Sequence, residues 1–315
     1  MMNREKAFEK MVTESKKSKK RSDTFFGFHP VINLLYFSLV IGFSMFFTHP
    51  VCLAVSLFCA ISYSVYINGK RAVRFTLIYM LPMLIMAALL NPAFNHQGAT
   101  ILAYLPSGNP LTLESILYGI SAAVMLVAVI SWFGCFNAVM TSDKFVYLFG
   151  RIIPALSLIL AMALRFVPRF RAQIKVISNA QKCIGRDVSD GNLLQKMKHG
   201  IKILSIMVSW ALENSIETAD SMKGRGYGLP GRTAFSIFRF DKRDGYALLY
   251  ILACSAVVIA GNFTGAYHFR YFPTIKGEWT GAALIVFAAY FTLGAFPIIV
   301  NIKEDIVWER IESKI

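Results

Sequence analysis

The residues closest to a known chemical motif are glycines in a long polar stretch of the chain. Gly226, Gly228 and Gly231 spell G-x-G-x-x-G, and Gly231 with Arg232 and Thr233 nearly spells the end of a phosphate-binding P-loop. Both motifs bind phosphate only where a strand precedes them and a helix follows, and the P-loop needs Lys where Arg232 stands. Here a long helical pattern precedes the glycines. We therefore expect no nucleotide site and no cofactor in this chain.

Histidine and cysteine could instead bind a metal or act in acid–base catalysis, but both are scattered. None of the five cysteines forms a C-x-x-C pair, and four lie in or beside apolar runs, where they act as small hydrophobic residues. Neither a metal site, including one at His96, nor a membrane enzyme is favoured. These residues are Cys52, Cys59, Cys135, Cys183, Cys254, His29, His49, His96, His199 and His268.

Two cytoplasmic helices carry the remaining candidates. The first is predicted from about Pro168 to Gly185. The second is predicted over 193–223, with Asn192 as N-cap and Gln195 as its capping-box partner. Its apolar or small residues recur at steps of three or four, which indicates one amphipathic helix about 45 Å long. They are Met197, Ile201, Leu204, Val208, Ala211, Ser215, Ala219 and Met222.

Both predicted helices end in glycine beside arginine. The residues are Ile184, Gly185 and Arg186 in the first helix, and Gly224, Arg225 and Gly226 in the second. One interpretation is structural: the glycines end the helices and the arginines interact favourably with the negative end of the helix dipole. The other is that an unobstructed guanidinium docks onto the carboxylates or carbonyls of a partner protein. The pattern alone leaves both open.

The elements around this region are apolar helices. Hydrophobic residues make up 56% of the chain although its net charge is +15, and the mean hydropathy is +0.52. Uncharged runs of nearly 20 residues suit a bilayer core of about 30 Å. We predict an all-α integral membrane protein with about six spans, at 31–48, 51–68, 75–90, 115–139, 246–263 and 282–300.

The basic residues set the predicted orientation. Of 33 Lys and Arg residues, all but Arg270 and Lys276 fall in the two tails and in alternate loops, which places both termini and the polar stretch in the cytoplasm. The apolar run 152–163 is too short to span and is read as a buried or interfacial helix. The expected parts are 1–24 (basic tail), 25–164, 165–243 (the two helices), 244–300 and 301–315 (tail).

The basic tail has a simple interpretation. Lys16, Lys17, Lys19, Lys20 and Arg21 form a cluster that we expect to lie against anionic headgroups, each charge contributing about 1 kcal/mol. No nucleic-acid-binding module is recognisable, so nucleic acid is not an expected partner.

Taken together, these residues resemble the transmembrane (T) component of energy-coupling factor (ECF) transporters, the EcfT/CbiQ-like family, which includes cobalt and nickel permeases. The resemblance covers nearly the whole chain after its first twenty-odd residues. The residues that carry it are His29, Pro30, Asn91, Pro92, Phe94, Asn95, His96, Gly98, Thr112, Glu114, Leu164, Arg165, Phe166, Val167, Pro168, Ala180, Gln181 and the run 219–228.

The resemblance implies a coupling subunit of an ABC importer for a vitamin or metal ion in the plasma membrane. Two ATPase subunits would bind ATP and Mg²⁺, and a substrate-binding S subunit would receive the motion. Each coupling helix would end in an Ala-Arg-Gly-like motif that binds one ATPase. Arg225 matches, with Gly224 in place of Ala. In the first motif Ile184 stands where the Arg is expected, and the nearest arginine is Arg186.

Two alternatives remain at this point: a membrane-embedded substrate-binding subunit, and another non-enzymatic membrane scaffold. The long cytoplasmic segment argues against the first. Asn91, Asn95 and His96 are expected to structure an outer loop. The aromatic residues of 265–280 could form an interfacial belt or a partner contact, and the belt is favoured. The transported substrate cannot be inferred, because in the resembling systems a partner sets it.

Overall fold

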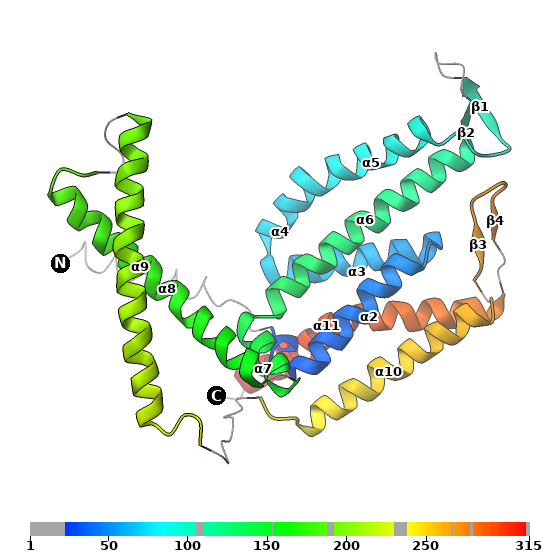
Figure 1. Ribbon diagram of the computed structural model, residues 1–315. Coiled ribbons are helices and arrows are strands. Elements are labelled where there is room, and N and C mark those ends of the chain that lie inside the picture. The colour runs from blue at the N-terminus through cyan, green and yellow to red at the C-terminus, as the bar shows by residue number, and fades with distance from the viewer. Residues whose placement is uncertain are drawn as a thin grey trace, which may run out of the picture. The chain divides into compact units, whose positions relative to one another are not determined.

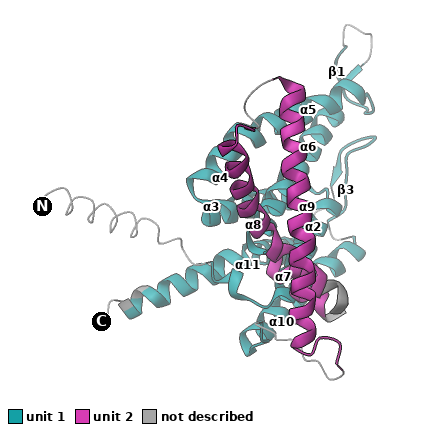
Figure 2. Ribbon diagram, turned by 60° about the vertical axis from the view of Figure 1, so that its left-hand side comes forward, with its two compact units in different colours: residues 1–141, 238–315 teal, residues 142–237 magenta. Residues whose placement is uncertain are grey.

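The computed structural model describes residues 23–104, 110–152, 154–187, 192–229, 238–265, 267–277 and 280–312. The basic tail cluster, residues 188–191 and Trp279 lie outside this part of the chain. The chain divides into two compact units, residues 1–141 with 238–315 and residues 142–237 (Figure 2). We call them the membrane unit and the insert.

The membrane unit is a set of apolar helices (Figure 1). Five stretches are long and apolar enough to cross a bilayer: Pro50–Asn68, Lys70–Phe94, Leu113–Val139, Lys242–Phe263 and Gly281–Trp308. The apolar helix Pro30–Phe46 is shorter, with 17 residues. The helices are α2 (Pro30–Phe46), α3 (Pro50–Asn68), α4 (Lys70–Phe75), α5 (Leu81–Phe94), α6 (Leu113–Val139), α10 (Lys242–Phe263) and α11 (Gly281–Glu312). The prediction of an all-α multi-pass membrane protein is confirmed.

The third apolar stretch is built differently from the others. It begins at Lys70 rather than near 75, and Thr76–Met80 between α4 and α5 is a π-helix. Pro82, two residues after the π-helix, has no N–H to donate, which removes one helical hydrogen bond at this point. Near its other end α5 approaches α6 closely, since a Cβ at Gly119 would lie 2.7 Å from the Ala88 carbonyl oxygen.

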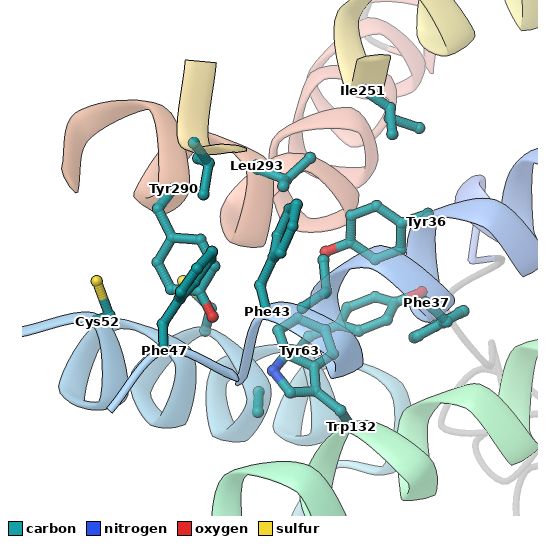
Figure 3. Packing of buried hydrophobic residues seen from close by; sticks show 14 of the residues in the cluster. Tyr36, Phe37, Phe43, Phe47, Cys52, Tyr63, Trp132, Ile251, Tyr290 and Leu293 are labelled. Carbon is teal, nitrogen blue, oxygen red and sulfur yellow. The ribbon is translucent and has the colours of Figure 1, made fainter. Parts of the chain in front are cut away.

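Aromatic side chains fill the core of the membrane unit (Figure 3). Tyr36, Phe37 and Trp132 are fully buried and meet edge to face. Polar groups lie among them: Trp132 Nε1 donates to Ser56 Oγ at 3.0 Å, and Ser44 Oγ contacts both Ser56 and Tyr290. This network joins α2, α3, α6 and α11. Its side chains supply one another's hydrogen-bond partners, so its role is to stabilise the packing of these four helices.

Two short hairpins lie at one end of the membrane unit (Figure 1). Strands β1 (Ile101–Tyr104) and β2 (Pro110–Thr112) connect α5 with α6, and β3 (Phe269–Arg270) and β4 (Lys276–Gly277) connect α10 with α11. The predicted aromatic belt in the second loop is wrong for Tyr267 and Tyr271, which are both 6% exposed. The Tyr271 hydroxyl instead bonds to the Thr48 carbonyl and Ser121 Oγ, at 2.8 and 2.7 Å.

The insert consists of α7 (Ser142–Ile152), α8 (Pro154–Cys183) and α9 (Leu193–Gly224). The first predicted cytoplasmic helix is corrected: instead of starting near Pro168, α8 joins the apolar run 154–163 to the basic part as one helix of 30 residues. Pro168 removes a single backbone hydrogen bond within it and does not end the helix. The predicted second helix is confirmed, and Gln195 Oε1 accepts from the Asn192 N–H at 3.2 Å.

Helices α8 and α9 pack through a small apolar cluster. Ile177 of α8 contacts Ile203 and Met207 of α9, and all three are buried. Beside them the Trp210 ring meets the Phe170 ring edge to face, with 5.7 Å between the ring centroids. The Arg169 guanidinium carbon lies 5.5 Å from the centroid of the Trp210 ring. These contacts fix the two helices against each other and therefore position their ends.

Candidate partner-docking site

The end of α8 is a tight glycine cap. Gly185 has φ +74°, which costs glycine little because it has no Cβ. The Gly185 N–H donates to the Lys182 carbonyl at 3.0 Å, and the Arg186 N–H donates to the Gln181 carbonyl at 2.9 Å. This pair of bonds defines a Schellman motif, which satisfies carbonyls that the helix end would leave without partners.

The end of α9 repeats the same hydrogen bonds. Gly226 has φ +80°, its N–H donates to the Lys223 carbonyl at 2.9 Å, and the Tyr227 N–H donates to the Met222 carbonyl at 3.0 Å. The glycine that allows the cap is therefore Gly226, and Gly224 is the last helical residue.

Because the two caps are alike, their residues correspond one to one. Gly185 corresponds to Gly226, so Ile184 occupies the backbone position of Arg225 and Arg186 occupies that of Tyr227. The side chains of Ile184 (61% exposed), Arg186 and Arg225 are all exposed. The glycine of each cap thus has a structural role, and the side chain before it extends into open space.

The two caps lie far apart. The end of α8 connects to the start of α9 through residues 184–192, whereas the second cap follows the last turn of α9 (Figure 1). A helix of 32 residues is roughly 48 Å long at 1.5 Å per residue. The two caps are therefore separate sites and do not form one groove.

Helix α9 also carries an apolar face that α8 does not cover. The residues predicted as its apolar stripe are mostly exposed, and a different set, Ile203, Ile206, Met207 and Trp210, contacts α8. The exposed residues, each with at least half of its area accessible, are Met197, Ile201, Leu204, Val208, Leu212 and Ile216. Within this chain α9 is therefore apolar on two sides.

Motif residues at the end of α5, at the start of α6 and in the segment between them bond to one another in the membrane unit. The buried Glu114 carboxylate accepts from the Thr100 hydroxyl at 2.9 Å, and a Cβ at Gly98 (φ +145°) would lie 2.5 Å from it. Asn91 Nδ2 donates to the Ser115 carbonyl at 3.0 Å, and Asn95 Oδ1 accepts from the Gln97 N–H. The structural roles expected for Asn91 and Asn95 are confirmed. Among the described residues no group of three or more His, Cys, Asp or Glu side chains could hold a metal ion.

Residues 23–29, which we call the N-terminal clasp, contain contacts that the sequence analysis missed. Asp23 accepts from Tyr63 and Asn301, and Arg243 lies over the Phe28 ring. Asp244, which binds the His29 N–H, lies three residues after the N-cap Asp241. That spacing is the one local signal that could have identified any of them.

Comparison with known proteins gives the family. A model of the cobalt transport protein family CbiQ matches residues 27–235. The energy-coupling factor transporter transmembrane protein EcfT of Lacticaseibacillus paracasei is 34% identical over 108 residues, which are 34% of this chain and 41% of that protein. EcfT of Lactococcus lactis is 34% identical over 105 residues, 33% of this chain and 40% of that protein.

A longer match is an uncharacterized MG181 homolog of Mycoplasma pneumoniae, 28% identical over 179 residues, 53% of this chain and 41% of that protein. The matched stretches thus span about two fifths of the length of these relatives. The family model, in contrast, covers most of the membrane helices, both glycine caps and the helices that position them. The chain therefore belongs to the cobalt transport protein family CbiQ.

Proposed function

We propose that this chain is the coupling membrane subunit of an ECF-type ABC importer. It would pass motion from two cytoplasmic ATPase subunits, which bind ATP and Mg²⁺, to a membrane subunit that binds a vitamin or metal ion. The observation that carries the proposal is the pair of matching glycine caps about one α9 length apart, each presenting an exposed side chain.

Arg225 is the proposed anchor of one ATPase. Its guanidinium offers five donors, and Gly224 and Gly226 on either side add no side chain that would obstruct a partner. At the other cap Ile184 provides an apolar contact and Arg186 the charge, two residues further on. The two ATPase subunits would therefore meet unlike surfaces.

A substrate-binding role for this chain is less well supported. One cavity of the membrane unit, lined by residues that include Thr48, His49, Asn262 and Tyr267, has a volume of about 140 Å³. Pockets that enclose a drug-sized ligand measure about 300–1,000 Å³. The polar groups in the helical core bond to one another and do not line this cavity.

Co-purification tests the proposal directly. The tagged full chain is expressed with two candidate ABC ATPase subunits, and wild type is compared with Arg225→Glu. We expect wild type to retain the ATPases and Arg225→Glu to lose most of them, since a carboxylate repels the acceptors that a guanidinium binds. Truncating a partner of a charged hydrogen-bonded pair typically costs about 2–5 kcal/mol.

Lys223→Glu is the matched control, because Lys223 is also exposed in the last turn of α9. It makes the same charge change and should retain the ATPases. Equal loss in both variants would indicate a general charge effect. Equal retention would reject Arg225 as the anchor, and absence of ATPase from the wild-type preparation would reject the proposed function.

A further inference from the structure

The chain passes between the membrane unit and the insert twice, at 141–142 and at 237–238. After the second crossing it enters α10, whose start contacts the N-terminal clasp. We propose that the clasp and residues 240–244 form a joint that makes the membrane unit follow movements of the insert. The inference rests on the proposed function, and it assigns positioning roles to Phe28, Arg243 and Asp244.

Arg243 makes an exposed contact of the joint. Its guanidinium carbon lies 4.3 Å from the centroid of the Phe28 ring, and Nη2 donates to the Gly27 carbonyl at 3.4 Å. Three residues earlier, before α10 begins, the Phe240 ring meets the His29 ring at 5.5 Å with an interplanar angle of 66°. A cation over an aromatic face contributes about 0.5–2 kcal/mol.

Asp244 connects two helices with one carboxylate. Its Oδ2 accepts from the Asp241 N–H at 3.1 Å, which closes the capping box at the start of α10. Its Oδ1 accepts from the His29 N–H at 3.3 Å, directly before α2. The side chain is buried, with 3% of its area exposed. A buried carboxylate is stable only when paired or hydrogen-bonded, so separating α2 from α10 here would leave it short of a partner.

The other side of the clasp is held by α3 and α11. Asp23 accepts from the Tyr63 hydroxyl at 2.9 Å and from Asn301 Nδ2 at 2.8 Å. Asn301 Oδ1 in turn accepts from the Thr24 N–H at 2.7 Å. Phe25 is fully buried, and its ring lies 5.1 Å from Tyr36. The clasp therefore joins the starts of α2 and α10 to two further helices.

The joint lies directly after the second crossing. Residues 238–241 lie between the insert and α10 and are not helical. The contacts of Phe240, Arg243 and Asp244 hold residues 240–244 against the clasp, so a displacement of residue 238 would act on α2 and α10 together.

Nucleotide-dependent hydrogen–deuterium exchange tests the joint without knowledge of the transported substrate. The complex of the full chain with its ATPase subunits is compared with and without the ATP analogue AMP-PNP and Mg²⁺. In wild type we expect exchange to change both in the insert and in the loops that follow α2 and α10. In Arg243→Ala the insert should respond as before, and the response of the two loops should fall by more than half.

Two control variants test whether the change in exchange is specific to the Arg243 contact. Arg239 is an exposed arginine of the same connection, and Arg239→Ala should respond like wild type. Arg243→Lys keeps a cation above Phe28 and should restore part of the loop response, which a loss of folding stability alone would not predict. If Arg243→Ala does not fold, Phe28→Leu removes the aromatic face and keeps an apolar side chain in its place.

The outcomes separate the two proposals. If the loops respond equally in wild type and Arg243→Ala, the joint is rejected and the proposed function stands. If the wild-type complex does not assemble, or its insert does not respond to nucleotide, the proposed function is rejected and the joint with it.

Discussion

His29 and His49 begin the first two helices of the membrane unit in the same way. Each is followed by proline, and Nδ1 of each accepts from the backbone N–H two residues on, at 3.4 Å for His29 and 3.2 Å for His49. A ring nitrogen accepts only when it is not protonated. The neutral imidazole is therefore the form that caps these helices.

The His49 cap predicts a pH dependence of stability. Burial lowers the pKa of His49 below its usual value of 6.5, so the folded protein disfavours the charged ring. Above pH 6.5 the ring is neutral in both the folded and unfolded states, and its contribution to stability is complete. As the pH falls below 6.5 the unfolded state binds a proton first, and the folded state loses stability.

We expect the melting temperature of the detergent-solubilised protein to fall between pH 7.5 and about pH 5.5. Asparagine also caps helices but does not titrate in this range, so His49→Asn should reduce the fall. His268→Asn, at an exposed histidine of the loop after α10, should leave it unchanged. A fall of the same size in wild type and His49→Asn would contradict the assignment.

At the residue scale, what the sequence predicts depends on whether the partners are local. Gly185, Gly226 and the Asn192–Gln195 pair were identified because their partners lie within five residues along the chain. The contacts of Asp23 with Asn301 and of Phe28 with Arg243 join positions more than 200 residues apart, and no periodicity reports such pairs. The docking role of the six cap residues stays a prediction.

At the element scale, Gly226 and Gly224 have opposite requirements. Gly226 has a positive φ, where any other residue costs about 1–2 kcal/mol, and a Cβ there would lie 3.2 Å from Leu229. Gly224 is helical and has open space around it, so alanine should stabilise the last turn by up to about 1 kcal/mol.

We therefore expect Gly226→Ala to open the cap, speed amide exchange over 222–227 and weaken ATPase retention. Gly224→Ala should slow that exchange and keep the ATPases. The measurements are hydrogen exchange on the purified chain and co-purification from co-expressing cells. Full ATPase retention by Gly226→Ala, with its cap opened, would show that docking does not need the cap geometry.

Elements were predicted well where the length of an uncharged apolar run or the periodicity of apolar residues decides them. All six apolar runs and α9 are helical. The start of α8 was placed 14 residues too late because proline usually marks a first turn, whereas one missing N–H is tolerated inside a helix of 30 residues. The hairpins and the buried Tyr267 and Tyr271 depend on packing between distant loops, which hydropathy does not record.

At the scale of the whole molecule, the distribution of basic residues predicts that the insert lies in the cytoplasm, and Cys183 is a natural probe of this. Cys183 is exposed at the end of α8, whereas Cys52, Cys59 and Cys135 are buried in the membrane unit and Cys254 lies within the apolar helix α10. A membrane-impermeant maleimide should therefore leave the chain unlabelled in intact cells and label it after permeabilisation. Cys183→Ser should abolish the label.

The labelling experiment also decides whether the apolar start of α8 crosses the bilayer. Residues 154–163 supply only ten residues, about 15 Å of helix, against a core of about 30 Å. If α8 nevertheless spanned the membrane, Cys183 would lie outside the cell and would be labelled in intact cells. Most of the basic residues of the insert would then lie outside as well. Labelling only after permeabilisation would place the end of α8 on the cytoplasmic side, where the proposed ATPase subunits could reach the Gly185 cap.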